Sequence, residues 1–333
     1  MTETRTARPS GALVLAAFAA VYVVWGSTYL AIRIAIETLP PLLMAGARFL
    51  LAGTLLYAIM RLRGEPAPER RHWKSTAIVG LLLLLFGNGA VVMAERTVPS
   101  GVAALLVAMV PMWMVLLEWL RRDGNRPTRR TIIGLVIGFA GMVLLVGPSG
   151  FVGGDRVDPF GAGLVVMGSL AWAAGSIYSR GAALPRSALL ATGMEMAWGG
   201  VWLVLAGTVL GEWGTVDPSA FTTRSILAFL YLVVFGSLVG FTAYIWLLGV
   251  STPARVSTYA YVNPVVAVLL GWALLNEPLN ARILGAAAII VAAVAVITMG
   301  KRPRAAPVAA AESARAVEEG AGDGTGAGRR SAA

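Results

Sequence analysis

Long apolar runs dominate this sequence, and they limit its possible folds more than any other feature. Most of them are about 18 to 23 residues long, which at ~1.5 Å per residue is enough for a helix to cross the ~30 Å hydrocarbon core of a bilayer. Only 13% of the 333 residues are charged, whereas ordinary soluble domains have about a quarter. A soluble globule is therefore excluded, and the runs are too long for a membrane β-barrel. We expect an all-α integral membrane protein.

Ten such runs can be placed along the chain, each bounded to within a few residues. The first follows Arg5 and Arg8 and could pass for a signal peptide. It is too long for one and no clean small-residue cleavage site follows it, so we expect it to be retained as a helix. The expected transmembrane helices are 13–32, 41–60, 75–94, 101–120, 131–148, 160–179, 188–210, 225–248, 254–274 and 281–299.

Membrane topology explains the net charge of +10. Placing residues 1–12 in the cytoplasm puts most of the 27 basic residues into cytoplasmic segments, as the positive-inside rule requires. Both termini are therefore expected inside, and no nucleic-acid partner is expected. Residues 301–333 contain little that could be buried and predict a disordered cytoplasmic tail. The preference for Arg over Lys, with many Ala and Gly, favours a bacterial source, and so the cytoplasmic (inner) membrane.

The residue counts also limit the chemistry of the chain. It has no cysteine, and His72 is its single histidine. These counts exclude disulfides, thiolate metal sites and multi-histidine metal or haem ligation. No P-loop pattern is present, so ATP-driven transport by this chain alone is not expected. We expect no metal and no cofactor.

The two halves of the chain resemble each other when the sequence is slid against itself. The segment that begins at Trp25 falls over the one that begins at Trp172, and Pro111 falls over Pro264. This pattern predicts a duplicated unit of five helices. Because five is odd, the two units insert with opposite orientations, which is the inverted repeat of secondary transporters. The units cover residues 13–148 and 160–299.

Ionisable and amide side chains inside the spans are rare, and each marks a candidate functional site. Asn88 and Asn263 lie in the middle of spans and are candidates for hydrogen bonds to a solute. Glu195 in the seventh span and Glu95 at the outer end of the third are candidates for proton coupling. The alternative for Glu195 is a structural hydrogen bond to a neighbouring helix.

Arg48 occupies the repeat position that matches Glu195, but the two residues enter from opposite faces of the membrane. They differ in depth by ~10 Å at helical rise, which is too far for a direct ion pair. We expect Arg48 to reach toward the outer headgroups or toward an outer carboxylate such as Glu37 or Glu95.

Mid-span prolines and aromatic residues predict where a solute pathway lies. Pro111 and Pro264 each free a backbone carbonyl that must face a cavity or a partner group; the alternative is an ordinary packing kink. Aromatic side chains hold apolar or cationic solutes, and the alternative for them is the interfacial aromatic belt. The expected substrate cavity is lined by Trp25, Tyr29, Asn88, Met93, Pro111, Trp172, Tyr178, Tyr244, Tyr259, Asn263 and Pro264.

Several short segments, spread over about residues 12–300, carry a family resemblance as a set. The segments are Trp25 to Tyr29, Ala47 to Phe49, Gly87 to Gly89, Val98 to Gly101, Val110-Pro111, Glu195-Met196 and Tyr259 to Pro264. Together they resemble the EamA-type transporters of the drug/metabolite transporter (DMT) superfamily, and within it the YedA-like inner-membrane exporters.

The resemblance implies a ten-helix inverted-repeat carrier with both termini inside, which exports small metabolites or drugs. It also implies a central cavity lined chiefly by the first, third, fourth, sixth, eighth and ninth spans. In this family the hairpin between the last two spans of each half often carries Glu-Pro. Glu277-Pro278 fits that pattern, whereas Arg126-Pro127 departs from it. The departure weakens any mechanism that needs symmetric glutamates.

The leading hypothesis is a secondary transporter that exports amino-acid-like or amphipathic solutes by alternating access. A solute gradient or protons would supply the energy. The alternatives are an integral-membrane lipid-processing enzyme, a channel or a scramblase. An enzyme would need acids, histidines or serines clustered at interfacial depth, but the outer carboxylates are scattered over different loops, so we do not expect one.

Overall fold

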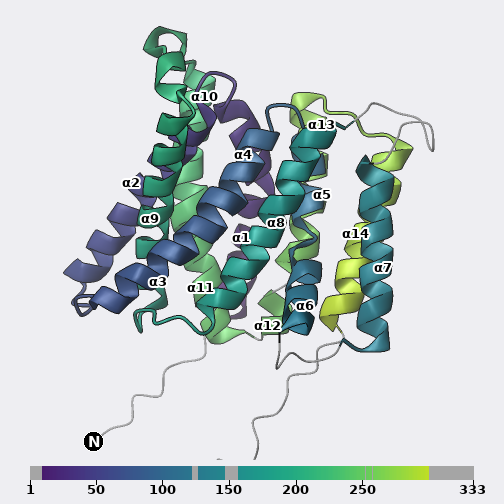
Figure 1. Cartoon of the computed structure of the whole chain (residues 1–333), viewed down its shortest axis with the longest axis horizontal. Helices are drawn as coiled ribbons and strands as arrows, with labels where there is room; N and C mark the ends of the chain where they lie inside the picture. Colours follow the sequence, from purple (N-terminus) through teal and green to yellow (C-terminus); the bar gives the residue numbers. More distant parts are fainter. Residues whose placement is uncertain (1–9, 122–126, 147–156, 252, 257, 300–333) are drawn as a thin grey trace, which may run out of the picture. The chain divides into compact units, whose positions relative to one another are not determined.

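The structure is a computed structural model that describes residues 10–121, 127–146, 157–251, 253–256 and 258–299. Every element among these residues is helical, and none of them forms a strand (Figure 1). The tail expected at 301–333 and residues 1–9 lie outside the described residues. The elements are α1 (Gly11–Ala35), α2 (Pro41–Leu62), α3 (Arg70–Gly80), η1 (Leu81–Gly89), α4 (Ala90–Ala94), α5 (Ser100–Val107), α6 (Val110–Leu120), α7 (Arg129–Val146), α8 (Pro159–Ser179), α9 (Ala188–Val209), η3 (Glu212–Thr215), η4 (Pro218–Ala220), α10 (Thr223–Tyr231), η5 (Leu232–Val239), α11 (Gly240–Val250), α12 (Pro253–Val256), α13 (Tyr259–Leu275) and α14 (Ala281–Met299).

Most of the predicted spans overlap these helices, but the span predicted at 254–274 contains α12 and the later start of α13 at Tyr259, and residues 147 and 148 of the fifth span lie outside the described residues. In the described part of the chain, 8 helical runs are long and apolar enough to cross a membrane, and two shorter apolar helices, Tyr259–Leu275 and Ala281–Ile297, follow them. Several runs begin where the sequence supplies a cap: the side chains of Ser10, Asp158 and Thr222 accept hydrogen bonds from the first turns of α1, α8 and α10. The prediction of a multi-pass, all-α membrane protein is confirmed.

Two of the runs are not regular α-helices. The run from Arg70 to Ala94 contains the π-helical segment η1, and the run from Thr223 to Val250 contains the π-helical segment η5. Each segment includes Phe-Gly followed by a small polar residue, which is Asn88 in η1 and Ser237 in η5. A π-helix shifts the hydrogen-bond register by one residue and is frequently found at functional sites.

The two mid-span prolines have different local effects. The helix is interrupted between Val107 and Val110, and Pro111 stands in the first turn of α6. This agrees with the distortion predicted at Pro111. Pro264 is buried inside α13, and the helix continues past it.

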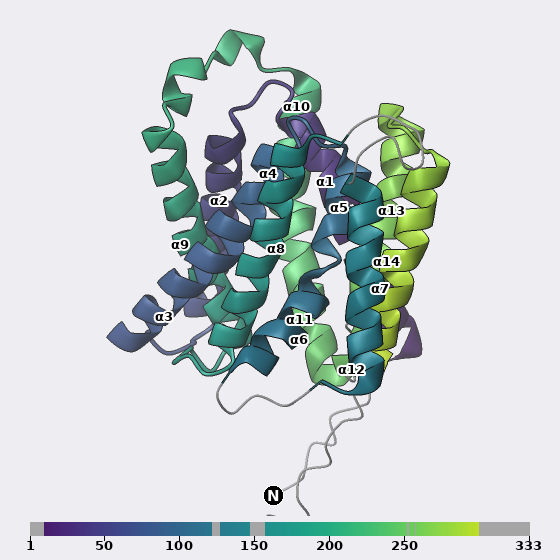
Figure 2. The same cartoon turned by 45° about the vertical axis from the view of Figure 1, so that its right-hand side comes forward.

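Helices α2 and α9 form one closely packed pair, and α7 and α14 form another (Figures 1 and 2). Glycines allow the first approach: a Cβ added at Gly53 would lie 2.4 Å from the backbone nitrogen of Ala197, and one at Gly193 would lie 2.9 Å from that of Tyr57. Small residues at such contacts are the usual basis of helix association in membranes.

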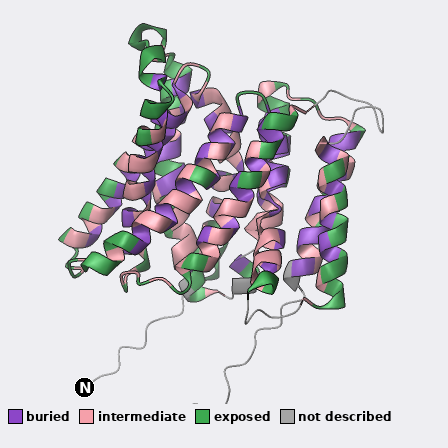
Figure 3. Ribbon diagram, in the orientation of Figure 1, coloured by how far each residue is buried: buried purple, intermediate pink, exposed green. Residues whose placement is uncertain are grey.

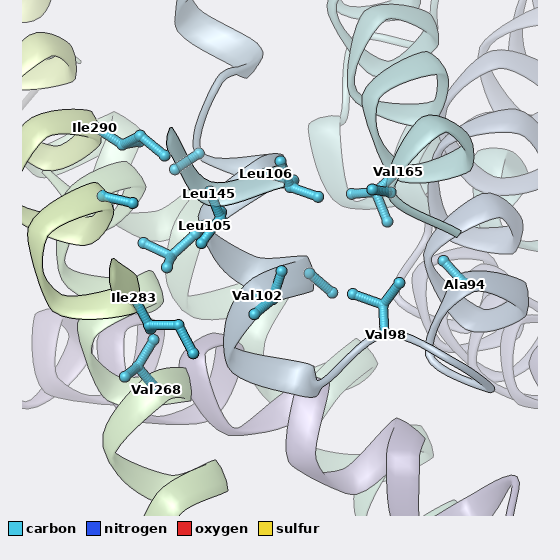
Figure 4. Packing of buried hydrophobic residues seen from close by; sticks show 14 of the residues in the cluster. Ala94, Val98, Val102, Leu105, Leu106, Leu145, Val165, Val268, Ile283 and Ile290 are labelled. Atoms are coloured by element: carbon cyan, nitrogen blue, oxygen red, sulfur yellow. The ribbon is translucent and has the colours of Figure 1, made fainter. Parts of the chain in front are cut away.

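The buried side chains form several clusters between the helices. The largest joins α4, α5, α7, α8, α13 and α14 and includes Leu105, Leu145 and Ile290 (Figure 4). A second joins α1, α2, η1, α9 and η5 around Phe49. The outermost helices also carry exposed apolar residues, such as Val136 of α7 (Figure 3), as expected for a surface that faces lipid.

The α2–α9 contact predicts opposite effects for two Gly→Ala changes. Gly53→Ala should lower the free energy of unfolding in detergent by about 1–3 kcal/mol, because the new methyl group collides with the backbone of α9. Gly163→Ala, on α8, has nothing within 4 Å of the new Cβ and should leave stability unchanged or raise it by up to about 1 kcal/mol. Thermal unfolding of both variants measures these changes in stability. Equal changes in the two variants would contradict the close α2–α9 contact.

Candidate functional site

An aromatic cluster fills the space between α1, α11 and α13. Trp25 of α1 stands at its centre, with ring centroids 5.1 Å from Phe241, 5.2 Å from Tyr244 and 5.3 Å from Tyr259. The rings of Tyr244 and Tyr259 lie 5.7 Å apart, nearly perpendicular to each other. Edge and tilted contacts of this kind are the favoured geometry of aromatic pairs. Three residues of the expected cavity, Trp25, Tyr244 and Tyr259, are therefore in mutual contact.

Glycines of the π-helical runs let two tryptophans approach. Trp25 Nε1 donates to the carbonyl of Gly236 in η5 at 3.3 Å, and a Cβ at Gly240 would lie 2.4 Å from Nε1. Trp172 of α8 packs in the same way on η1, where a Cβ at Gly87 would lie 2.8 Å from its ring. Trp25 and Trp172 are the residues that coincide when the two halves are aligned. Each packs on the π-helical segment of the other half of the chain.

The two asparagines are bonded differently. The amide of Asn263 faces two carbonyl oxygens, that of Tyr259 at 3.2 Å and that of Tyr22 at 3.3 Å, so its nitrogen is assigned to them. It thereby links α13 to α1 one residue before Pro264. The Oδ1 atom of Asn88 in η1 has no hydrogen-bond partner among the described residues. Of the two asparagines, Asn88 is thus the one that keeps an oxygen without a partner in the described part of the chain.

The remaining residues of the expected cavity are dispersed. Tyr29 packs beside the largest hydrophobic cluster, and Met93 packs beside the one around Phe49. Pro111 lies at the start of α6, and Tyr178 is 38% exposed near the end of α8. The structure therefore gathers only part of the expected set, around Trp25.

Two glutamates in loops cap the first turns of transmembrane helices. Glu212 accepts from the backbone nitrogens of Leu42 (3.0 Å) and Leu43 (2.9 Å) in α2. Glu277 accepts from those of Ser100 (2.7 Å) and Gly101 (3.1 Å) in α5. A carboxylate there satisfies donors that have no partner within the helix and interacts favourably with the helix dipole. The Glu-Pro pair of the last hairpin thus has a structural role.

Most other carboxylates in the segments that connect the helices at this end of the bundle also have hydrogen-bond or ion-pair partners. Glu37 pairs with Arg224 at 3.5 Å, and Asp158 Oδ2 accepts from the Thr97 hydroxyl at 2.6 Å. That bond and the backbone donors of α8 lower the pKa of Asp158. Among the described residues there is no cluster of three acidic or histidine side chains that could hold a metal ion.

Glu95 differs from these carboxylates. It lies one residue beyond α4 and is fully buried, and neither of its oxygens has a hydrogen-bond partner among the described residues. Burial, and then the carboxylate of Glu277, raise its pKa well above the usual range, while Arg33 acts in the opposite direction. Tyr29 is also within its electrostatic range. Glu95 therefore keeps its proton at a pH where a carboxyl group in water is ionised.

The expected contacts of Arg48 were wrong. Its guanidinium reaches neither an outer carboxylate nor the headgroup region: it is 3% exposed, and its Nε donates to the hydroxyl of Ser237 in η5 at 3.0 Å. The depth of a residue along α2 does not determine the direction of its side chain, and the rotation of α2 turns Arg48 toward η5. Glu195 of α9 is partly exposed and forms no hydrogen bond with another described residue, so the alternative of a structural hydrogen bond is not found there.

Sequence reasoning did not identify Ser237, Phe241 or the capping role of Glu212. A signal for Ser237 was present, because Phe235-Gly236-Ser237 falls over Phe86-Gly87-Asn88 when the halves are aligned. The other two depend on contacts between segments far apart in the chain, which residue spacing does not reveal.

Comparison with known proteins gives consistent results. The model of the EamA-like transporter family matches residues 11–147 and again residues 159–299. The chain is 43% identical to the "Uncharacterized inner membrane transporter YedA" of Escherichia coli (strain K12), over 87% of this chain and 93% of that protein. It is 25% identical to the "Uncharacterized transporter YvbV" of Bacillus subtilis (strain 168), over 94% and 98%. A solved structure of 22% identity has a TM-score of 0.55 over 87% of this chain and 98% of its own, which shows a similar fold.

The capping geometry predicts that Glu212→Ala is more damaging than loss of a surface carboxylate. Glu212→Ala should lower the free energy of unfolding by about 1.5–3 kcal/mol, because charge-assisted bonds to α2 are lost in a buried setting. Glu37→Ala, which breaks one exposed ion pair, should cost at most about 1 kcal/mol. Thermal unfolding in one detergent compares them, and equal losses would argue against the cap.

Proposed function

We propose, from the premise that this chain belongs to the EamA-like transporter family, that it is a secondary transporter working by alternating access. In this proposal residues 13–148 and 160–299 are the two inverted five-helix repeats, and the chain is a carrier of small molecules and not an enzyme. The observation that carries the proposal is the reciprocal packing of Trp25 on η5 and of Trp172 on η1. An inverted repeat gives each half an equivalent gate, and alternate opening of the two gates is transport.

The π-helical segments are the proposed points of flexion. Their hydrogen-bond register is already shifted within otherwise regular helices, so each can exchange with an α-helical turn at small cost. The break before Pro111 and the turn around Pro264 provide further places for bending. In the described arrangement the rings around Trp25 close the space between α1, α11 and α13.

The proposed location is the bacterial cytoplasmic membrane, with both termini in the cytoplasm. The name of the Escherichia coli relative as an inner membrane transporter supports the membrane, and the distribution of basic residues supports the orientation. The proposed direction is export, and the proposed solutes are amino-acid-like or amphipathic. The aromatic cluster supports this class, because it offers apolar area with few charges.

Efflux from right-side-out vesicles loaded with a mixed panel of amino acids and cationic drugs tests the proposal. A carrier should show efflux that saturates with internal solute and accelerates when the same solute is present outside. Flux that rises linearly with the internal solute concentration and is unaffected by external solute would instead indicate a channel or scramblase. Chemical conversion of lipid or solute without saturable flux would support the enzyme alternative.

Protons are the proposed coupling ion, with Glu95 as the group that carries them and Glu195 as the second candidate. Glu95 is supported by its burial, by the absence of a hydrogen-bond partner in the described part, and by the nearby Glu277 and Arg33. Its raised pKa means that it takes up a proton when closed in and releases it when water reaches it.

Coupling of one proton to one solute makes a quantitative prediction. A gradient of one pH unit should sustain a solute ratio of up to about tenfold across wild-type proteoliposomes. Glu95→Gln cannot exchange a proton and should equalise the solute at any pH gradient while still showing saturable exchange. Glu195→Gln is the matched comparison. Loss of the gradient-driven ratio in Glu195→Gln but not in Glu95→Gln would reverse the assignment.

A further inference from the structure

Arg48 is a buried cation that takes no part in the transport mechanism proposed above. It lies in the second turn of α2 and is 3% exposed. No carboxylate of a described residue lies within 4.0 Å of it. The aromatic ring of Phe49 lies beneath its guanidinium, 4.6 Å from the central carbon to the ring centroid. The charge is thus held inside the protein without an opposite charge among the described residues.

The hydrogen bonding of Arg48 leaves one side of its guanidinium unused. Nε donates to the Ser237 hydroxyl at 3.0 Å, and no other hydrogen bond joins Arg48 to a described residue. Nη1 and Nη2 therefore retain their donors, in the parallel arrangement that matches the two oxygens of a carboxylate. Ser237 accepts from Nε, so its own proton is available to the same anion.

The glycine at residue 236 lets Nη2 of Arg48 lie close against η5. A Cβ at Gly236 would lie 3.1 Å from Nη2 and 3.0 Å from Cγ2 of Thr28. Both distances are shorter than ordinary van der Waals contact, so a side chain at residue 236 would displace Nη2 at the point where α1, α2 and η5 meet. The carbonyl of the same glycine accepts the bond from Trp25 Nε1, so the aromatic cluster begins directly beside Arg48.

We propose that Arg48, with the Ser237 hydroxyl, is the subsite for a carboxylate of the transported solute, and that the solute's apolar body lies against the aromatic cluster around Trp25. This rests on the proposed transport function. A single arginine balances a single negative charge, so the subsite favours a monocarboxylate over a phosphate dianion. A buried charge without a partner is costly, and a solute that supplies the missing charge is held correspondingly well.

Binding of a small carboxylate tests the subsite without knowledge of the natural solute. Acetate and acetamide have the same shape and differ in charge, so they are compared as stabilisers of the purified full-length protein at constant ionic strength. Acetate should raise the Tm of the wild type more than acetamide does. In Arg48→Gln the concentration of acetate needed should rise by about tenfold or more, and the difference between the two probes should disappear.

Several variants separate the subsite from general effects of charge. Arg48→Gln removes an uncompensated buried charge and is expected to fold. Arg48→Lys keeps the charge but loses the two-pronged geometry, and should retain a weakened response. Gly236→Ala should also weaken it by crowding Nη2. Arg224→Gln, which removes an exposed arginine, should respond like the wild type. An acetate response that is absent in the wild type, or that persists in Arg48→Gln, overturns the proposal.

Transport of matched probes distinguishes failure of this inference from failure of the proposed function. Proteoliposomes are assayed with 4-methylpentanoate and its amide. Saturable flux of the carboxylate in the wild type, lost in Arg48→Gln, supports the subsite. Flux of the carboxylate that is unchanged by Arg48→Gln overturns the subsite and leaves the carrier function standing. Acetate binding that depends on Arg48, in a protein that shows no saturable flux of any solute, overturns the carrier and leaves an anion site.

Discussion

The satisfaction of backbone hydrogen bonds in a region without water governs this structure. In hydrocarbon each unpaired peptide group costs several kcal/mol, so every described span is helical, and several helix ends and irregular turns are bonded to side chains of other segments. The first turns of α2 and α5 receive the carboxylates of Glu212 and Glu277. In the π-helical segment η5, the carbonyl of Gly236 accepts a hydrogen bond from Trp25. Next to Pro264, the amide of Asn263 donates to backbone carbonyls of α13 and α1. These two helix ends and these two turns are thus linked to segments distant in the chain.

The same constraint explains why so few residues carry the proposed chemistry. A polar side chain inside the membrane needs a partner, and most of those described here have one. Besides Asn88 and Glu195, the exceptions include Glu95, which has no hydrogen-bond partner on either oxygen among the described residues, and Arg48, which has a single neutral partner. One group suits a proton and the other a carboxylate. Glu95 and Arg48 both lie near aromatic side chains of α1. In the proposed mechanism the solute binds there, between the two repeats.

Much of the fold could be predicted from the sequence, because crossing a bilayer requires apolar runs of a fixed length. The spans, and the helical interruption near Pro111, follow from that requirement and from the missing donor of proline. The π-helical segments could not be predicted, since an extra residue in one turn barely changes the hydropathy of a span. The partner of Arg48 was also missed. Depth can be counted along a helix, but the direction in which a side chain points depends on how the helices pack. Trp25, Tyr244 and Tyr259 were expected together and are together, whereas Tyr178 was expected with them and lies exposed.

The central claim is that the two ends of the helix bundle open in alternation, and paired spin-label distances test it most directly. The chain has no cysteine, so label pairs can be introduced without background. One pair, Arg96→Cys with Thr223→Cys, reports on the end where α4 stops and α10 starts. The other, Lys74→Cys with Val250→Cys, reports on the opposite ends of the same two runs, and all four positions are exposed. On addition of a transported solute, the account predicts that one distance lengthens while the other shortens. Distances that stay fixed, or that change together, would contradict alternating access.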